Sequence, residues 1–469
     1  FREFFAEERR SRRAACASKA LGSCTGHEGR RVQGFSIMRV AVIGSGISGL
    51  AAARHLDQAG VATVLFEAEP RFGGHTATVD VTLDGVTAPV DTGFLVCNDH
   101  TYPNLLALFA ELGVELASSD MSFSVRADAA DVEWAGATLA SVFAQKANLF
   151  RPRFWRFLAD ILRFNREATR MVEAGAIPEG SVERYLREAG YGGELFDWYL
   201  WPMVGSIWSS PKSEVAEFEL AMLLRFSHNH GLLRINHRPR WMTVVGGGRT
   251  YVERIVAALP DCRLACPVMR IDRQPGGVWV ESRHGRERFD HVVFACHSDQ
   301  ALAILGAGAT LAERKALGAI RYQPNRCVLH TDRSFMPRRN TAWSAWNYLQ
   351  TAADRDADRP VTLTYWLNRL QPLPFSRPLF ETLNPPRDPA PGHLIAAFEY
   401  AHPLLNRTAV AAQAEVERLQ GQNNTWFAGA WLGYGFHEDG LKSGLAAARG
   451  VIESIQATTA AEPPRLAAE

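Results

Sequence analysis

Three glycines and one carboxylate form the first group of residues that could do chemistry. Gly44, Gly46 and Gly49 follow the apolar run VAVI in a GxGxxG pattern. Glu67 ends a second apolar run about 20 residues further on, the spacing at which an acidic residue accepts hydrogen bonds from ribose hydroxyls. The helix after the glycines would point its free N–H groups at a pyrophosphate. The spacing therefore predicts a unit that binds a dinucleotide, either NAD or FAD.

These residues need a buried parallel sheet to position them. The run VAVI is typical of a strand buried on both faces, and VATVLF is expected to form its neighbour. A helix is expected between them, from about Ser48 to Gly60. Strand, glycines, helix, strand and acid occur in the order of a βαβ unit, which favours this interpretation over a glycine turn without a ligand.

Composition limits the remaining classes of function. The 469 residues are enough for two domains, and the net charge of +1 gives no reason to expect nucleic acid as a partner. Seven scattered cysteines are typical of a reducing, cytoplasmic protein, and we predict no metal site. No apolar run reaches the length of a membrane-spanning helix.

Residues 1–37 differ from the rest of the chain. They are rich in Arg and lack an initiator Met, whereas Met38 directly precedes the first predicted strand. We interpret residues 1–37 as a disordered N-terminal extension, with a basic targeting segment as the alternative.

A second glycine turn follows Glu67 at once. Arg71 precedes Gly73 and Gly74, and its cation could neutralise a phosphate. A nicotinamide-binding unit has no need of this turn. Together with GxGxxG, the set resembles the motif of the flavin-containing amine oxidase, phytoene desaturase and protoporphyrinogen oxidase superfamily. The resemblance implies that these residues lie along FAD, with His75 either facing the flavin or serving as a polar loop residue.

The resemblance extends over about residues 38–458. The segments VDTGF, PVMRI and WFAGA…DGLKSG carry it further, and it implies a backbone contact from Val268 to the adenine and an aromatic Phe436 beside the flavin. The cofactor-binding residues that it implies are Gly44, Gly46, Ser48, Gly49, Glu67, Ala68, Arg71, Gly73, Gly74, His75, Thr92, Gly93, Val268, Gly429, Gly440, Leu441 and Ser443. Because residues 400–430 contain no cysteine, we predict that FAD is held non-covalently.

The predicted fold is α/β, with a Rossmann-like FAD-binding domain of the glutathione-reductase type and an inserted α+β substrate domain. The expected FAD-binding domain comprises residues 38–124, 241–318 and 416–458. The expected substrate domain comprises residues 125–240 and 319–415, and residues 459–469 form a C-terminal tail.

One segment of the substrate domain alternates aromatic and basic residues. Phe150, Trp155 and Leu162 lie among Lys146, Arg156 and other cations, a pattern that suits an anionic membrane surface. A helix that packs against the domain and keeps a solvated basic face is the alternative. We therefore predict a cytoplasmic protein and hold a peripheral contact with the inner membrane as a hypothesis.

Aromatic residues from several segments are predicted to line a hydrophobic substrate site. These candidates are Trp201, Trp208, Tyr322, Trp343, Trp346, Tyr365, Trp431, Tyr434 and Phe436. The segments SHNHGLL, WNYLQ and YGFHEDGLKSG also resemble bacterial predicted FAD-binding proteins encoded beside cyclopropane-fatty-acid-synthase-like methyltransferases, which suggests a fatty-acyl substrate.

We therefore predict an FAD-dependent enzyme that removes hydride from a small hydrophobic, fatty-acyl or other lipid-like substrate. The catalytic candidates are His437, Glu438, Phe436 and Tyr434, with Asp439 beside them; structural roles for His437 and the carboxylates are the alternative. An amine or amino-acid oxidase is one rival, and a non-catalytic flavoprotein or lipid-handling partner of a methyltransferase is another. Because residues 322–439 contain no lysine, a quinone or a protein is favoured over oxygen as electron acceptor. The sequence leaves that acceptor and the oligomeric state unknown.

Overall fold

The computed structural model describes residues 38–234, 238–351 and 360–461. The predicted N-terminal extension, residues 1–37, lies outside the described residues, as does most of the predicted C-terminal tail. Helix α16 spans His437–Ala461, so the first residues of the predicted tail, 459–461, belong to this helix.

A five-stranded parallel sheet forms the nucleotide-binding core, in the order β10-β2-β1-β14-β20. Val40 and Val42 of its central strand pack into the core on one face, and Ala41 and Ile43 into the core on the other. This alternation explains why VAVI is apolar at every position. The strands are β1 (Arg39–Ile43), β2 (Ala62–Phe66), β10 (Cys262–Arg263), β14 (His291–Phe294) and β20 (Thr425–Phe427).

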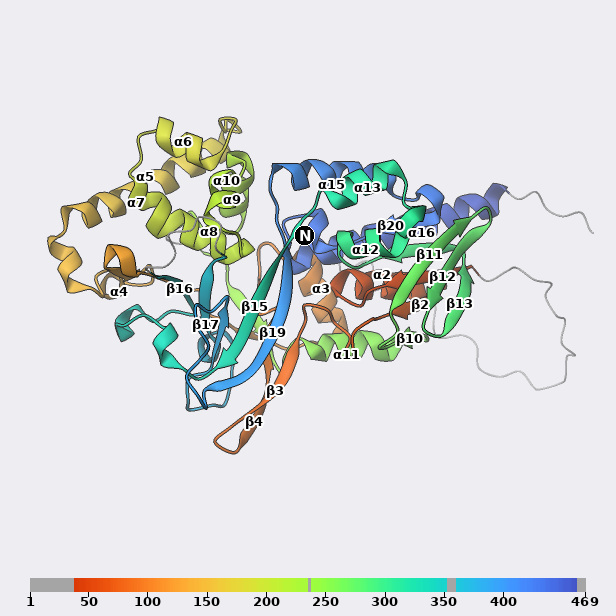
Figure 1. The fold of residues 1–469 in the computed structure, drawn as a ribbon, viewed down its shortest axis with the longest axis horizontal. Helices are drawn as coiled ribbons and strands as arrows, with labels where there is room; N and C mark the ends of the chain where they lie inside the picture. Colours follow the sequence, from red (N-terminus) through yellow and green to blue (C-terminus); the bar gives the residue numbers. More distant parts are fainter. Residues whose placement is uncertain (1–37, 235–237, 352–359, 462–469) are drawn as a thin grey trace, which may run out of the picture. The chain divides into compact units, whose positions relative to one another are not determined.

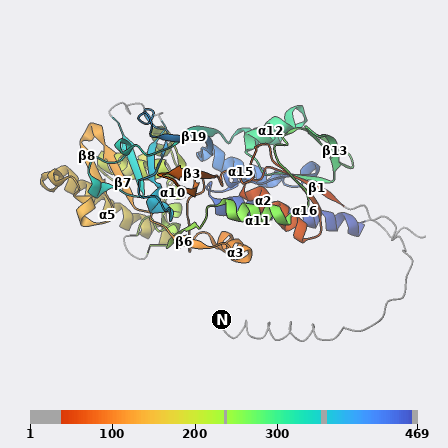
Figure 2. The same cartoon turned by 90° about the horizontal axis from the view of Figure 1, so that it is seen from below.

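Helices cover both faces of this sheet (Figure 1). Helix α2 spans Ile47–Gln58, close to the predicted range, and contacts both α16 and α11; the three lie side by side when seen from below (Figure 2). One face is covered by α2, α3 (Pro103–Leu112), α11 (Arg249–Ala258) and α16. The other is covered by α12 (Ser298–Leu305), α13 (Leu311–Gly318), α15 (Arg407–Leu419) and a hairpin sheet of β11 (Val268–Gln274), β12 (Gly277–Ser282) and β13 (Gly285–Phe289).

A mixed seven-stranded sheet forms the wall of the predicted substrate region, in the order β19-β15-β18-β17-β16-β7-β8. The expected sheet over residues 322–366 is part of it. Its strands are β7 (Phe123–Ala127), β8 (Val132–Ala135), β15 (Tyr322–His330), β16 (Trp346–Gln350), β17 (Thr362–Trp366), β18 (Phe380–Leu383) and β19 (Leu394–Pro403).

A layer of helices packs against this sheet through one aromatic core. Its longest member is α5 (Pro152–Glu173), which begins with a proline at its first turn and buries Phe154, Phe157 and Phe164 on one face. The other members are α4 (Leu139–Val142), η2 (Lys146–Phe150), α6 (Val182–Glu188), α7 (Gly193–Leu195), η3 (Phe196–Leu200), α8 (Trp201–Trp208), α9 (Lys212–Ala216) and α10 (Leu220–Asn229).

Smaller elements connect these layers. They are β3 (Thr78–Leu83), β4 (Val86–Asp91), β5 (Cys97–Asn98), β6 (Leu116–Ser118), β9 (Trp241–Val244), α14 (Leu367–Leu370) and the short turns η1 (Asp128–Ala130), η4 (Gly306–Gly308), η5 (Arg333–Phe335), η6 (Asn340–Ala342), η7 (Gln422–Asn424) and η8 (Ala430–Leu432).

Two predicted domain boundaries fall inside elements. Strand β7 begins at Phe123, before the boundary at 125, and α15 begins before the boundary at 416 although it packs on the nucleotide-binding side. No helix among residues 38–234, 238–351 and 360–461 combines the length and apolarity that crossing a bilayer requires.

Candidate flavin and substrate site

The three glycines of GxGxxG have three different surroundings. Gly44 has a φ of +101°, and a Cβ there would lie 2.8 Å from the Ala295 carbonyl oxygen. A Cβ on Gly49 would lie 1.8 Å from the Gly44 carbonyl oxygen, so this position packs helix α2 against the turn. A Cβ on Gly46 would meet nothing within 4 Å. Gly46 therefore faces open space at the N-terminus of α2, where a phosphate can approach.

Glu67 lies directly beside this turn. Its carboxylate is 7% exposed and accepts hydrogen bonds from the Ser45 N–H at 2.9 Å, from the Ser45 hydroxyl and from the Glu69 N–H at 2.9 Å. The Cys266 N–H donates to the Glu67 carbonyl at 2.7 Å, which brings the segment before Val268 to the same corner. Val268 is buried, whereas Ala68 is exposed.

The second glycine turn packs on the first. The Gly73 N–H donates to the Ser45 carbonyl at 3.2 Å and to the Ser45 hydroxyl at 3.1 Å, and a Cβ on Gly74 would lie 3.0 Å from Gly46 Cα. Arg71 is exposed, donates to the Thr76 carbonyl at 3.2 Å and has no carboxylate partner within the described part of the chain. Its guanidinium is therefore free to meet an anion beside the two turns.

Thr92 and Gly93 pass behind the second turn. A Cβ on Gly93 would lie 2.0 Å from the His75 carbonyl oxygen, so only glycine permits this close contact. The Phe94 N–H donates to the same oxygen at 2.9 Å, and the Thr92 hydroxyl lies 3.0 Å from the Tyr400 hydroxyl. These contacts fix the backbone from which the His75 ring projects.

The closing segment reaches the same turn from the C-terminal side. A Cβ on Gly440 would lie 2.7 Å from Ile47 Cγ2, and one on Gly444 would lie 2.1 Å from the Ser48 carbonyl oxygen. The Ser443 hydroxyl accepts from the Gly429 N–H at 2.9 Å, and Leu441 and Ser48 are buried. Gly444 therefore lets the backbones of α16 and α2 approach each other closely.

A group of three imidazoles and one phenol lies beyond the second glycine turn. The His75 ring centroid is 5.8 Å from that of His297, 5.3 Å from that of Tyr400 and 5.5 Å from that of His402. His75 Nε2 is shielded from water and has no hydrogen-bond partner among the described residues. That His75 faces the flavin therefore stays a prediction, and sequence reasoning missed His297 and His402.

The three imidazoles are held neutral by their surroundings. Removal from water, reinforced by electrostatic coupling to His297 and Arg71, lowers the pKa of His75 to about 4. Removal from water also lowers the pKa of His297 to about 4 and that of His402 to about 3. Desolvation raises the pKa of the Tyr400 phenol. We therefore expect all four rings to be uncharged at neutral pH.

The predicted acid and base candidates have structural partners. Glu438 is 3% exposed and accepts from the Asn104 N–H at 3.1 Å, the Asn104 amide at 2.6 Å and the Leu105 N–H at 3.0 Å, so it caps α3. Asp439 accepts from the Tyr434 and Phe436 N–H groups at 3.0 and 3.1 Å. These contacts favour the structural alternative, and we do not retain Glu438 as a catalytic group.

His437 also has a structural environment. Its Nε2 lies 2.9 Å from the Thr76 hydroxyl and 3.1 Å from the Tyr251 hydroxyl, and its ring stacks on Phe94 at 3.8 Å. Removal from water lowers its pKa to about 3. His437 therefore supports the segment behind His75 as a neutral ring.

Substitution of Glu438 tests the capping role. Glu438→Ala leaves the first N–H groups of α3 without an acceptor, and we expect a loss of about 2–3 kcal/mol in the free energy of unfolding. The rate of flavin reduction per folded molecule should stay unchanged. Urea unfolding and single-turnover reduction measure the two effects, with Glu438→Gln as the milder control. A stable Glu438→Ala protein with strongly slowed reduction would return Glu438 to the chemistry.

The face of the seven-stranded sheet toward the helical layer is aromatic. Tyr365 pairs directly with Trp346 on one side and with Glu381 on the other, so the three side chains share a face. Phe398 and Tyr400 are two residues apart on β19, and the pairing of β19 with β15 places both side chains on this same face. Trp346, Tyr365, Phe398 and Tyr400 each keep some accessible surface although they lie in the interior. We call these four residues the aromatic face.

Other predicted wall residues divide into three groups. Trp201 packs edge-on against Tyr348 at 5.5 Å, and Trp208 packs against Phe436 at 6.4 Å, so both cover this face from the helical layer. The Trp208 indole N–H also donates to the Tyr434 carbonyl at 2.9 Å. Tyr322 instead stacks on His297 at 4.3 Å.

Trp343 and Trp431 are not wall residues. Trp343 packs against Trp366 and Phe380, whose side chains point away from the aromatic face. Trp431 is 2% exposed in the nucleotide-binding core, where its indole N–H donates to the Cys296 carbonyl at 3.0 Å.

Glu381 is the buried carboxyl on the aromatic face. It is 1% exposed, and apart from the Cys327 thiol neither of its oxygens has a hydrogen-bond partner in the described residues. Desolvation raises its pKa well above the usual value, which favours the protonated carboxyl. The Trp346 indole N–H, on the same face beyond Tyr365, is also buried without a partner among the described residues. No sequence motif marked Glu381.

The fold and the two glycine turns define a dinucleotide-binding flavoprotein. The adenosine diphosphate part of FAD fits the open side of Gly46, the Glu67 carboxylate and the free Arg71 guanidinium. His75, whose Nε2 has no hydrogen-bond partner among the described residues, follows the second glycine turn on the side of the aromatic face. A model of the flavin containing amine oxidoreductase family matches residues 47–452. The chain therefore belongs to this family of oxidoreductases, and its cofactor is non-covalent FAD.

Individual relatives resemble the chain more distantly. AofH of Mycobacterium tuberculosis, a provisionally named flavin-containing monoamine oxidase, is 26% identical over 277 residues, which are 56% of this chain and 58% of that relative. Cyclohexylamine oxidase from Brevibacterium oxydans has 18% identity and a TM-score of 0.64 over 90% of this chain and 100% of its own. The CLA-producing fatty acid isomerase from P. acnes has 15% identity and a TM-score of 0.61 over 89% and 98%. The two structures share the fold.

Proposed function

We propose that the chain removes hydride from an uncharged, hydrophobic substrate, fatty-acyl or another lipid-like chain, as a dehydrogenase or desaturase. The observation that carries this proposal is the neutrality of the aromatic face and of the imidazoles beside it. When bound, FAD would accept the hydride with its electron pair, and the proton lost from the adjacent carbon would pass to an uncharged imidazole beside the site, such as that of His75.

Five ionisable groups that face this region are shifted toward their neutral forms. Desolvation raises the pKa of Glu381 and Tyr365 and lowers the pKa of His75, His297 and His402. A charged substrate would lose its hydration without meeting a fixed opposite charge, which costs several kcal/mol. A hydrocarbon chain has no such cost and gains from contact with the aromatic rings.

The chain's own residues then orient and shield the substrate. Trp346, Tyr365 and Phe398 provide the wall, while Trp208 and Phe436 close the region from the helical side and keep water away. The fatty acid isomerase among the structural neighbours supports a fatty-acyl chain as a substrate class for this fold. The absence of lysine from residues 322–439 supports a quinone or protein as electron acceptor.

An amine substrate is the second candidate, and Glu381 is the observation that favours it. The positive charge of an ammonium group would lower the pKa of this carboxyl and favour its ionised form, and the ammonium could lie against the rings of Trp346 and Tyr365. Cyclohexylamine oxidase and putrescine oxidase are among the structural neighbours, which supports the same candidate.

The Glu381→Gln variant separates the two candidates. Because Gln has the shape of the protonated carboxyl, we expect reduction by an acyl substrate to stay within about threefold of the parent rate. Reduction by an amine that relies on the ionised carboxyl should fall by about 100-fold. The measurement is anaerobic stopped-flow reduction with each substrate class.

Glu399→Gln is the matched control for this experiment. Glu399 lies on β19, which is separated from β18 by β15 in the same sheet, and it is exposed on the other face. It should leave both rates unchanged. A parent protein that reduces only with amines, and loses that reaction in Glu381→Gln, would contradict the acyl proposal.

A further inference from the structure

An exposed apolar tip projects from the helical layer. Phe150 is 86% exposed and Leu139 80%, with Trp155, Leu162 and Leu149 between 43% and 50% exposed. The Trp155 indole N–H donates to the Leu149 carbonyl at 3.0 Å, and the Phe143 and Trp155 ring centroids are 5.2 Å apart, so the end of α4, η2 and the start of α5 pack together. We call Leu139, Leu149, Phe150, Trp155 and Leu162 the apolar tip. A cluster of large exposed apolar side chains marks an interaction site.

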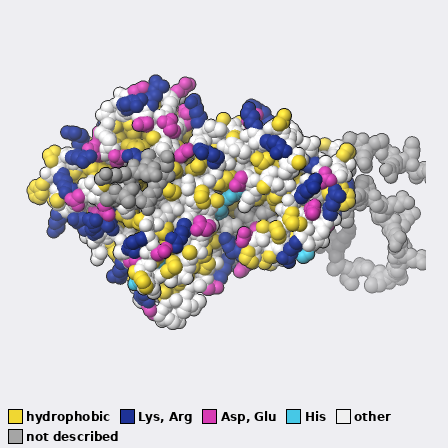
Figure 3. Space-filling view, in the orientation of Figure 1, with side chains coloured by type: hydrophobic (Ala, Val, Ile, Leu, Met, Phe, Trp, Pro, Cys, Tyr) yellow, Lys and Arg dark blue, Asp and Glu magenta, His cyan; other side chains and the backbone are white. Residues whose placement is uncertain are grey.

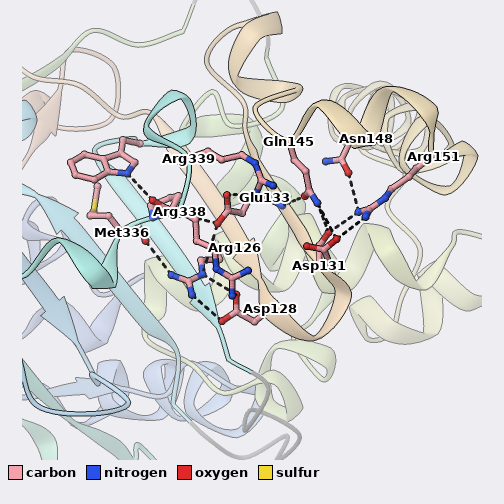
Figure 4. A network of polar contacts seen from close by, with 12 residues as sticks. Arg126, Asp128, Asp131, Glu133, Gln145, Asn148, Arg151, Met336, Arg338 and Arg339 are labelled. Carbon is pink, nitrogen blue, oxygen red and sulfur yellow. Dashed lines mark hydrogen bonds and ion pairs between the residues drawn. The ribbon is translucent and has the colours of Figure 1, made fainter.

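The base of the apolar tip is fixed by a polar network. Gln145 donates from its amide to the Asp131 carbonyl at 3.0 Å and to the Asp131 carboxylate at 3.1 Å, and it accepts from the Glu133 N–H at 3.0 Å. Arg151 donates to the same Asp131 carbonyl and carboxylate, each at 2.7 Å. Figure 4 shows these side chains converging on Asp131. Both ends of η2 are thus held to one residue of the β7-β8 hairpin, so Leu149 and Phe150 are presented on an ordered turn.

Cations follow the segment that carries most of the apolar tip. Residues 146–170 contain seven Lys and Arg against two carboxylates, a net charge of +5 in a chain whose total is +1. Arg151, Arg153 and Arg163 pair with carboxylates. Lys146, Arg156, Arg166 and Arg170 have no carboxylate within ion-pair distance among the described residues. Apolar and basic side chains meet at the left edge of Figure 3, over α4 and α5.

We propose that the apolar tip docks on an anionic phospholipid surface. Cations near such a surface are attracted by the lipid phosphates, and each large apolar side chain that leaves water strengthens the binding further. The unpaired cations suit the phosphates at the surface of the bilayer, and the phenylalanine and tryptophan suit the acyl chains beneath them. The tip belongs to the helical layer that packs on the aromatic face, but the inference does not depend on which substrate the site takes.

Vesicle flotation of the full-length FAD-loaded protein tests this proposal. We expect binding to phosphatidylcholine vesicles that contain phosphatidylglycerol, weaker binding at high salt, and little binding to phosphatidylcholine alone. Leu149→Ser with Phe150→Ser should weaken binding by about tenfold or more, and Arg156→Gln with Arg166→Gln and Arg170→Gln should remove the preference for phosphatidylglycerol.

Leu311→Ser is the matched control, because Leu311 is equally exposed at 86% but lies on α13 in the nucleotide-binding region. It should bind vesicles as the parent does, and bound FAD in every variant reports an intact fold. Unchanged vesicle binding by the Leu149→Ser, Phe150→Ser protein would overturn the proposal. So would a self-association in sedimentation velocity that this variant abolishes, because the apolar tip would then be a contact between copies.

Discussion

The Gly49→Ala variant is expected not to fold into an FAD-binding protein. The Gly46→Ala variant is expected to fold but to bind FAD weakly. A Cβ on Gly49 would lie 1.8 Å from the Gly44 carbonyl oxygen, and neither backbone can move without separating α2 from β1. We expect a destabilisation of about 3 kcal/mol or more. A Cβ on Gly46 has no protein atom within 4 Å, and its φ of −62° suits alanine.

The loss in Gly46→Ala should therefore appear in FAD binding alone. The methyl group occupies the space that the pyrophosphate needs, so we expect at least about a tenfold rise in the Kd for FAD, or 1.4 kcal/mol. Thermal unfolding of the FAD-free proteins and titration with FAD measure the two effects separately. A Gly46→Ala protein that binds FAD like the parent would place the pyrophosphate elsewhere.

Acid is expected to destabilise the fold steeply below pH 6.5. His75, His297, His402 and His437 have an unfolded pKa near 6.5, but in the folded protein their pKa values lie at about 3 to 4. Above pH 6.5 both states are neutral and stability is complete. Below pH 6.5 these histidines bind protons in the unfolded chain but stay unprotonated in the folded chain. Each histidine then removes about 1.4 kcal/mol per pH unit until its folded pKa is reached.

Urea unfolding from pH 8 to pH 4.5 tests this expectation. Stability should be level with respect to these groups from pH 8 to 7 and should fall with a slope of several protons from about pH 6.5 toward 4. His402→Asn should lower that slope by one proton, since it removes one imidazole from the group. A stability that stays level from pH 7 to pH 5 would contradict the neutral, shielded state of these rings.

The nucleotide end of the site was predictable because its signals are local. Gly44, Gly46 and Gly49 each obey a backbone constraint set by near neighbours, and Glu67 follows at the distance of one helix and one strand. The apolar run VAVI likewise reflects burial on both faces of a strand. Such constraints act within a short stretch, so a single sequence displays them.

The substrate end was not predictable in the same way. His75, His297 and His402 come from three distant segments, and their meeting depends on how the two sheets are placed. Glu381 looks like an ordinary strand residue until its pairing with Tyr365 places it on the aromatic face. Glu438, next to the closing glycines, looked catalytic, but its partners lie on α3, far away in the chain. Long-range packing decides these roles.

The central claim is hydride removal from an uncharged acyl chain, and anaerobic reduction of the FAD-loaded protein tests it most directly. The protein is mixed with phosphatidylglycerol vesicles whose acyl chains are monounsaturated, and in parallel with cyclohexylamine and putrescine. The visible absorbance of the flavin should decrease with the lipid but not with either amine. Mass spectrometry should then find an acyl product that is two hydrogen atoms lighter. Bleaching by an amine, with the acyl chains recovered unchanged, would contradict the claim.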